Sequence, residues 1–148
     1  MRSALVVGGS NGIGMTIALE LAVMYEEVTI IDKAVPDIDL PTNISFKEIN
    51  LLNNRFDFLS EYDKIDTLII TAGFGRVTRF ENIIDKEIDN SFQVNVVALT
   101  HILHHYYPRM QQTENFYCAV MGSIAGLVSS PLFSLYAATK AAICRLTE

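Results

Sequence analysis

The sequence contains no tryptophan and only two cysteines among its 148 residues. Cys118 and Cys144 are isolated from each other and stand in apolar surroundings, so they indicate neither a disulfide framework nor a metal site. Basic residues are also few, because 11 Lys and Arg stand against 17 Asp and Glu and give a formal net charge of −6. Proteins that bind nucleic acids need clustered Lys and Arg to contact phosphates, so this composition excludes a general nucleic-acid binder.

Long hydrophobic runs are missing as well. No apolar stretch approaches the roughly 20 residues that a helix needs to cross a bilayer, so we expect no membrane segment. The N-terminus enters a short apolar run that ends in glycines and has no cleavage site, which is typical of a buried strand rather than a signal peptide. Half of the residues are hydrophobic and 19% are charged, without repeats, so we expect one globular domain, residues 1–148, in the cytoplasm.

The hydrophobic residues that are present form continuous runs of strand length rather than alternating ones. Such runs predict strands covered on both faces, hence a parallel sheet. They occur at 4–7, 28–31, 67–70 and 116–121, with a weaker one near 44–46. Helical patterns lie between them, at about 12–25, 53–61, 85–111 and 134 to the end. Strands that alternate with helices predict a doubly wound α/β domain, and Pro108 is expected to break the long helix near its end.

The first turn between a strand and a helix is rich in glycine. Gly8, Gly12 and Gly14 stand where backbone N–H groups and the helix dipole meet, and they let a pyrophosphate approach the backbone. Asp32 follows Gly14 by 18 residues, at the end of the second predicted strand. A carboxylate there can accept the hydroxyls of an adenosine ribose and would repel a 2′-phosphate. The pattern therefore predicts a dinucleotide site that prefers NAD to NADP, a preference that the neighbouring Lys33 weakens.

The last predicted helix carries a tyrosine and a lysine four residues apart. Because a helix turns once in about 3.6 residues, Tyr136 and Lys140 share one face, with their polar ends within reach of each other. A neighbouring ammonium group favours a phenolate over a phenol, which suits acid–base chemistry. The alternative is an ordinary helix with one half-buried tyrosine and one lysine whose amine reaches solvent. The pair alone does not decide between the two.

Five motifs in the right order closely resemble the short-chain dehydrogenase/reductase family over essentially the whole chain. They are the turn GGSNGIG, the segment TAGFG at 71–75, Asn95 in VNVVA, Ser123 in GSIAG and the pair YxxxK at 136–140. Ser123 precedes Tyr136 by 13 residues, which is the usual interval in that family. The resemblance implies a Rossmann-like, doubly wound parallel sheet of about five strands.

The resemblance also implies a role for each matching residue. Tyr136 would be the general acid in carbonyl reduction and the base in alcohol oxidation, while Lys140 would make it more acidic and hold the nicotinamide ribose. Ser123 would orient the substrate oxygen, and the backbone of Asn95 would hold a water that links the lysine to solvent. Alone, Ser123 would be interpreted as a cap at a strand end and Asn95 as a solvated helix residue. The residues expected to bind the cofactor are Gly8, Ser10, Asn11, Gly12, Ile13, Gly14, Asp32, Asn50, Leu51, Ala72, Gly73, Tyr136 and Lys140.

Three positions depart from the family pattern. Val7 replaces the threonine usual before the first glycine, and Thr71 replaces the first asparagine of the Asn-Ala-Gly segment, so bracing hydrogen bonds are expected to be lost or rearranged. Asn50 stands where the family usually has aspartate at the adenine, although an amide oxygen can still accept from the adenine amino group. These changes question the affinity for the cofactor more than the fold.

Three histidines lie close together on the long predicted helix. His101, His104 and His105 are spaced so that they share a face, which raises the possibility of a metal site. No nearby cysteine or clear carboxylate partner completes such a site, and the family needs no metal there. We therefore expect no metal and interpret the histidines as a solvated or interface cluster. The helix pair at this location commonly forms the dimer interface in the family, so a homo-oligomer is expected.

The chain ends at Glu148, within the last predicted helix. Family members continue through further strands, so the resemblance implies a domain without the family's C-terminal strands, in which strand 116–121 is an uncovered edge that dimerises, swaps or aggregates. Two functions remain open. One is an oxidoreductase that transfers a hydride between NAD(H) and a secondary alcohol or ketone. The other is a non-catalytic dinucleotide-binding or oligomerisation module. Residues 73–79 and 127–133 are expected to line a partly apolar substrate pocket.

Overall fold

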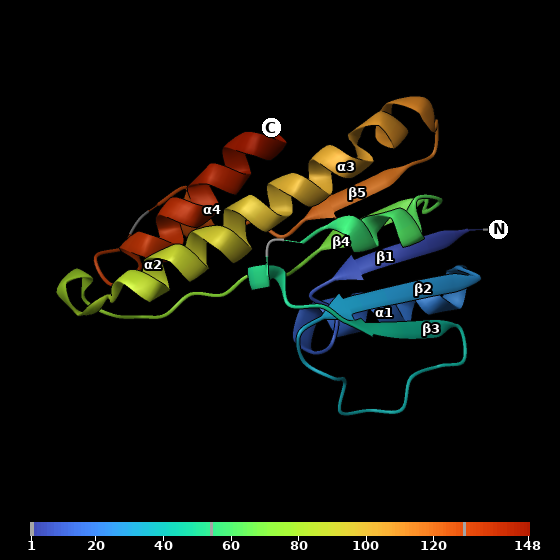
Figure 1. Cartoon of the computed structure of the whole chain (residues 1–148), viewed down its shortest axis with the longest axis horizontal. Coiled ribbons are helices and arrows are strands. Elements are labelled where there is room, and N and C mark those ends of the chain that lie inside the picture. The colour runs from blue at the N-terminus through green and yellow to red at the C-terminus, as the bar shows by residue number, and fades with distance from the viewer. Residues whose placement is uncertain (1, 54, 129) are drawn as a thin grey trace.

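A computed structural model describes residues 2–53, 55–128 and 130–148. Five parallel strands form one sheet in the order β3-β2-β1-β4-β5 (Figure 1). The strands are β1 Ser3–Val7, β2 Glu27–Asp32, β3 Ile44–Glu48, β4 Thr67–Ile70 and β5 Tyr117–Val120. The α-helices are α1 Gly12–Met24, α2 Asp85–Phe92, α3 Leu99–Gln112 and α4 Ser134–Thr147. This architecture confirms the predicted Rossmann-like fold.

The central strand β1 shows why its apolar run is continuous. Ala4 and Val6 pack on the same side as α1, in a cluster that includes Met15. Leu5 and Val7 point to the opposite side, into the cluster beneath α3. Since side chains alternate along a strand, a strand covered on both faces needs apolar residues at every position. These four of the five β1 residues are at most 1% exposed.

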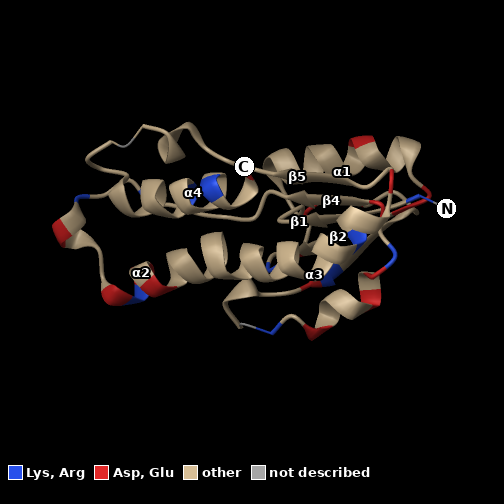
Figure 2. Cartoon of the chain, turned by 90° about the horizontal axis from the view of Figure 1, so that it is seen from above, with Lys and Arg blue, Asp and Glu red and all other residues tan. Residues whose placement is uncertain are grey.

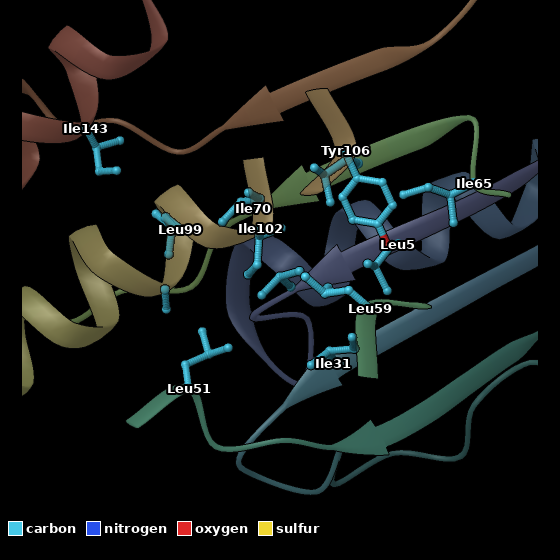
Figure 3. Packing of buried hydrophobic residues seen from close by; sticks show 13 residues of the cluster. Leu5, Ile31, Leu51, Leu59, Ile65, Ile70, Leu99, Ile102, Tyr106 and Ile143 are labelled. Atoms are coloured by element: carbon cyan, nitrogen blue, oxygen red, sulfur yellow. The ribbon is translucent and has the colours of Figure 1, made fainter. Parts of the chain in front are cut away.

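The larger core cluster joins α3 to the sheet (Figure 3). Leu99, Ile102 and Tyr106 recur at intervals of three and four residues along α3, and each is at most 1% exposed. They pack over Leu5 of β1 and Ile70 of β4. Burying one such side chain contributes about 1.5–3 kcal/mol, so this helical stripe holds α3 firmly on the sheet.

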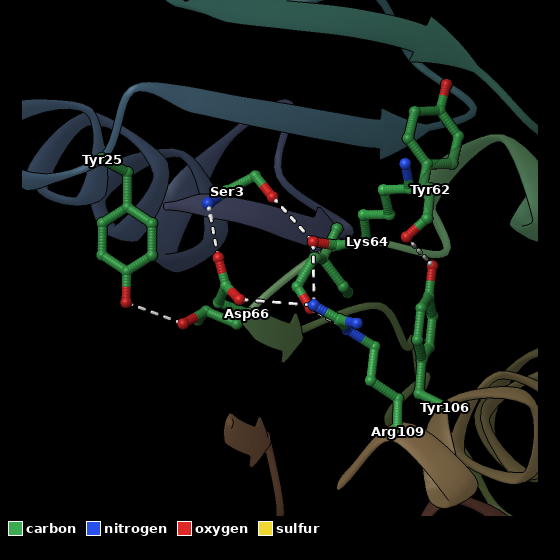
Figure 4. Close-up of polar contacts among 9 residues, drawn as sticks. Ser3, Tyr25, Tyr62, Lys64, Asp66, Tyr106 and Arg109 are labelled. Atoms are coloured by element: carbon green, nitrogen blue, oxygen red, sulfur yellow. Dashed lines mark hydrogen bonds and ion pairs between the residues drawn. The ribbon is translucent and has the colours of Figure 1, made fainter. Parts of the chain in front are cut away.

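The end of α3 is also tied to the sheet by polar contacts (Figure 4). The Arg109 guanidinium donates from Nε to the carbonyl of Ile65 at 2.6 Å and from a terminal nitrogen to the carbonyl of Lys64 at 3.1 Å. It also lies 3.4 Å from Oδ1 of Asp66, whose Oδ2 accepts the backbone N–H of Ser3 at 3.1 Å. These bonds connect α3 with the starts of β1 and β4, at the opposite end of the strands from the glycine turn.

The prediction that Pro108 breaks the long helix is wrong. Residues 85–112 are helical throughout, as α2, a π-helical segment Gln93–Ala98 and α3, and Pro108 lies inside α3. Pro108 and His104, four residues earlier, are both exposed. Water can therefore satisfy the carbonyl that the missing N–H leaves free, while Arg109 holds the last turn in place.

The helical segment predicted near 53–61 is 3₁₀ rather than α-helical. The structure has two 3₁₀ segments there, Leu51–Asn53 and Asp57–Tyr62. The Oδ1 atom of Asn50 accepts the N–H of Leu52 at 3.0 Å, a local turn that competes with a regular helix. Asn54, which belongs to the predicted range, lies outside the described residues.

In the view of Figure 2, acidic and basic residues are interspersed along the described part of the chain. The stretch 121–139, which leads from β5 into α4, contains no charged residue.

β5 forms one edge of the sheet, and its residues Tyr117, Cys118 and Ala119 are exposed. Within the described residues, no helix combines the length and the apolar character needed to cross a membrane.

Candidate active site

The glycine turn packs directly against the loop that follows β4. Gly8 and Gly12 have positive φ angles of 89° and 53°, which side chains rarely tolerate. A Cβ atom on Gly8 would lie 2.6 Å from the Cα of Ala72, and one on Gly14 would lie 2.5 Å from Oγ1 of Thr71. The Thr71 hydroxyl donates to the carbonyl of Gly8 at 2.9 Å. Thr71 therefore braces the turn itself, so the hydrogen bond is rearranged rather than lost.

The first turn of α1 is open to an anionic ligand. Its N-cap residue is Asn11, whose side chain makes no capping hydrogen bond in the described structure, and the first turn contains no acidic residue. The backbone N–H groups of a first helical turn lack partners within the helix and carry a partial positive charge. They can accordingly bind a phosphate.

A cavity of about 540 Å³ opens at the carboxyl ends of β1, β2 and β4. In an α/β sheet, the crevice at this end is the expected place for a ligand. Nine of the predicted cofactor residues line it, namely Gly8, Asn11, Ile13, Gly14, Asp32, Asn50, Leu51, Ala72 and Gly73. Ser10, Gly12, Tyr136 and Lys140 are not among its lining residues.

Lys140 is buried at the end of this cavity. Lys140 is 3% exposed, and its Nζ donates to the carbonyl of Met121 at 2.8 Å. Met121 and Gly73 both line the cavity, and a Cβ atom on Gly73 would lie 3.4 Å from Nζ. Burial lowers the pKa of Lys140, and the nearby Cys144 thiol acts in the opposite direction. Nζ also lies 5.9 Å from the ring centroid of Tyr136, so the two residues do share a face.

Asn95 joins three parts of the site from within the π-helical segment. Its side chain accepts the N–H of Phe74 at 3.0 Å and donates to the Phe74 carbonyl at 2.7 Å. It also donates to Oγ1 of Thr139 at 3.0 Å, and that hydroxyl donates to the carbonyl of Tyr136 at 2.8 Å. Asn95 is 0% exposed, so it is not a solvated helix residue. Single π-turns inside α-helices often mark functional sites, and here the segment carries the residue that links the β4 loop to α4.

Tyr136 is confined by the loops that follow β4 and β5. A Cβ atom on Gly75 would lie 2.6 Å from Cγ of Tyr136, so the loop backbone approaches the ring as only glycine allows. The ring of Phe133 is 6.0 Å away on the other loop. Ser123 caps the 3₁₀ turn that follows β5, where its Oγ accepts the N–H of Ala125 at 3.1 Å. A hydroxyl that accepts one bond can still donate its own proton.

Several cavity residues were not predicted from the sequence. Asn90 and Val94 line the cavity from the long helix, and Leu52 lines it from the 3₁₀ segment Leu51–Asn53. Asn90 and Val94 are four residues apart and therefore share a helix face. Their spacing could have identified them only if the orientation of the helix over the sheet had been known.

The histidines of α3 have other partners. The ring of His101 stacks on Phe56 at 4.7 Å, and Nε2 of His105 lies 2.8 Å from Oδ1 of Asp63. Among the described residues, no group of three or more His, Cys, Asp or Glu side chains could hold a metal ion.

Comparisons with known proteins agree with this geometry. A family model described as short chain dehydrogenase matches residues 2–148. A 3-oxoacyl acyl-carrier-protein reductase of Staphylococcus aureus is 25% identical, in an alignment that covers 99% of this chain and 66% of that protein. An uncharacterized short-chain type dehydrogenase/reductase of Sinorhizobium fredii is 28% identical, with 95% and 58% covered. The chain thus spans two thirds or less of the length of these relatives.

Solved structures share the fold. A short chain dehydrogenase/reductase family protein superposes with a TM-score of 0.89 at 24% identity, with 99% of this chain and 65% of that chain covered. A 4-hydroxyisoleucine dehydrogenase complexed with NADH and succinate gives a TM-score of 0.84 at 22% identity, with 97% and 69% covered. ElxO with NADP bound gives 0.81 at 21% identity, with 98% and 64% covered.

Proposed function

The chain belongs to the short-chain dehydrogenase family, and on this premise we propose that it is an oxidoreductase that transfers a hydride between NAD(H) and a secondary alcohol or ketone. One observation carries the proposal. The cavity that is lined by the glycine turn is also lined by Met121, whose carbonyl accepts from the buried amine of Lys140, and by Gly73, where an added Cβ atom would lie 3.4 Å from that amine. A dinucleotide with its pyrophosphate on α1 therefore has its other end beside the residues suited to acid–base chemistry.

The protein's own residues would handle the proton. A nicotinamide bound in the cavity supplies or accepts the hydride. Tyr136 donates its phenolic proton to the substrate oxygen during reduction and takes it back during oxidation. The Lys140 ammonium stabilises the phenolate, and the Ser123 hydroxyl donates to the substrate oxygen. Asn95 ties the loop after β4 to α4, the helix that carries Tyr136 and Lys140, and its backbone is proposed to hold the water that returns the proton to solvent.

The proposed cofactor is NAD rather than NADP. The support is Asp32, a carboxylate on the cavity wall at the end of β2, which would repel a 2′-phosphate. Lys33 also lines the cavity and reduces this preference. Structural neighbours bind either NADH or NADP, so the choice depends on these local residues.

The proposed substrate is an uncharged, partly apolar carbonyl compound or alcohol. Residues 127–133 contribute Leu127, Val128 and Leu132, which are 74%, 70% and 43% exposed. The facing loop carries Arg76, but its guanidinium pairs with Glu87, with Nε to Oε1 at 2.7 Å. Arg79, at the end of the same loop, lies 3.8 Å from Oε1 of Glu81. Both basic residues of the range 73–79 thus have an acidic partner, and the range 127–133 contains no charged residue. Ser129, which belongs to the range 127–133, lies outside the described part of the chain.

We extend the proposal to a homo-oligomer in the cytoplasm. α4 lies alongside the long helix, where it contacts α2 and the π-helical segment Gln93–Ala98 (Figure 1). The family resemblance predicts self-association through this helix pair. Light scattering that reports a dilute monomer would contradict the assembly.

Titration with NADH and then NADPH, followed by nicotinamide fluorescence, tests the cofactor proposal first. We expect saturable binding that favours NADH. In a ketone screen with NADH, the wild type should show turnover, whereas Tyr136→Phe should bind NADH almost unchanged and lose nearly all turnover, because only the proton donor is removed. Turnover retained in the variant would contradict the mechanism. Binding without turnover in the wild type would instead favour a dinucleotide-binding module.

A further inference from the structure

The carboxylate of Asp32 is held by the glycine turn of the neighbouring strand. The backbone N–H and the hydroxyl of Ser10 both donate to Oδ2 of Asp32, at 3.1 and 2.7 Å. The N–H of Lys33 donates to Oδ1 at 2.7 Å. Ser10 is 2% exposed, whereas Asp32 lines the cavity and Ser10 does not. Ser10 therefore lies behind the carboxylate rather than beside a ligand.

These three bonds restrict what Asp32 can accept. An ionised carboxylate has about four acceptor positions, two on each oxygen. Both positions on Oδ2 are used by Ser10, and one on Oδ1 is used by Lys33. One position on Oδ1 remains for a ribose hydroxyl. The backbone is fixed as well, because the carbonyl of Asp32 accepts the N–H of Ile49 at 2.8 Å.

We propose that Ser10 is a positioning residue for cofactor choice, which acts by fixing the Asp32 carboxylate in the cavity wall. The inference rests on the proposed function, since it concerns the same dinucleotide. A fixed anion can accept a ribose hydroxyl and cannot turn away from a 2′-phosphate. Without the Ser10 hydroxyl, the carboxylate keeps only the two backbone N–H bonds and can move more freely, which lengthens the mean distance between the like charges and weakens their repulsion. Ser10 thus contributes to selectivity without contacting the cofactor.

The test is the ratio of the dissociation constants for NADPH and NADH, measured by fluorescence titration. In Ser10→Ala the ratio should fall about three- to tenfold, mainly because NADPH binds more tightly. Ser10→Thr keeps the hydroxyl and should preserve the ratio. Ser91→Ala is a matched control, because Ser91 is also buried, at 4% exposure, but lies on α2 and does not line the cavity. It should leave the ratio unchanged.

A double-mutant cycle separates positioning from a merely structural role. Asp32→Asn should itself lower the ratio, and adding Ser10→Ala in that background should change it no further, because the carboxylate is already gone. Equal weakening of both nucleotides by Ser10→Ala, with the ratio intact, would overturn the inference and leave the proposed function standing. A wild-type chain that binds neither nucleotide would overturn both.

Discussion

At the scale of single residues, Gly75 controls the position of Tyr136. A side chain on Gly75 would enter the space of the tyrosine ring, with its Cβ 2.6 Å from Cγ and 2.9 Å from Cβ of Tyr136. We expect Gly75→Ala to reduce kcat about 100-fold, since displacements of roughly 1 Å have effects of that size. NADH binding should change little, because Gly75 does not line the cavity.

The matched control for this prediction is Gly122→Ala. A Cβ atom on Gly122 would lie 3.5 Å from Sγ of Cys144, an ordinary van der Waals distance. This variant should keep most of its turnover with the same ketone. If Gly75→Ala turned over at the wild-type rate, Tyr136 would not depend on the close approach of the loop.

Lys140 predicts a specific pH dependence of stability. Burial holds its pKa below the usual value of 10.5 in the folded chain, so between the folded and unfolded values the unfolded chain binds more protons. The buried charged amine of Lys140 therefore destabilises the folded chain fully at pH values below its folded pKa. This destabilisation decreases, and the free energy of unfolding rises, as the pH increases towards 10.5. Lys140→Met, similar in length and uncharged, removes this contribution.

Urea unfolding of both proteins over this alkaline range measures the effect. The stability of the wild type relative to Lys140→Met should increase with pH. The comparison also cancels the contributions of Tyr62 and Tyr106, whose pKa values are raised by burial in the wild type and whose surroundings the substitution leaves in place. Parallel curves for wild type and variant would show that Lys140 titrates alike in the folded and unfolded chains.

At the scale of secondary-structure elements, α3 contains a proline in its interior, although proline is usually expected to end a helix. Pro108 lies on the exposed side and leaves the carbonyl of His104 to water. Replacing Pro108 by Ala restores the backbone donor, so we expect a gain of about 1–3 kcal/mol in the free energy of unfolding. Urea denaturation measures this gain. A loss of stability would indicate that the proline ring makes a packing contact that outweighs the hydrogen bond.

The elements predicted best from the sequence are those whose packing makes their patterns simple. β1, β2 and β4 are continuous apolar runs because helices cover both faces, and their bounds follow within one residue. The pattern at 53–61 predicted a short helix, and the structure has the 3₁₀ helix Asp57–Tyr62 there. Local spacing does not show which type of helix forms.

In the candidate site, too, some features follow from local sequence patterns and others depend on tertiary packing. The glycine turn and the Tyr136–Lys140 pair are local patterns, so the sequence predicts them. The bonds of Asn95 to Phe74 and Thr139 join residues 21 and 44 positions apart. Only the packing of the long helix between the β4 loop and α4 brings these residues together, and no spacing rule contains that information.

At the scale of the whole molecule, a bound dinucleotide should stabilise the fold. The cavity is built from the β1, β2 and β4 ends of the sheet together with the long helix, so a ligand there contacts several elements at once. At a concentration about 100 times its Kd, a ligand adds about 2.7 kcal/mol. For a chain of this size that amounts to a rise in Tm of about 5–10 °C. Differential scanning fluorimetry with NADH measures it, and NADPH at the same concentration should give a smaller rise.

The link between Ser10 and Asp32 makes cofactor preference an epistatic trait. If Asp32 alone changed to a small or basic residue, the buried N–H and hydroxyl of Ser10 would both lose their acceptor, at a cost of about 1–3 kcal/mol for each unsatisfied group. The first step towards NADP would therefore lower stability before selectivity improved. If the chain prefers NAD as proposed, a lineage or an engineer that moves it to NADP would have to change the turn and the strand end together.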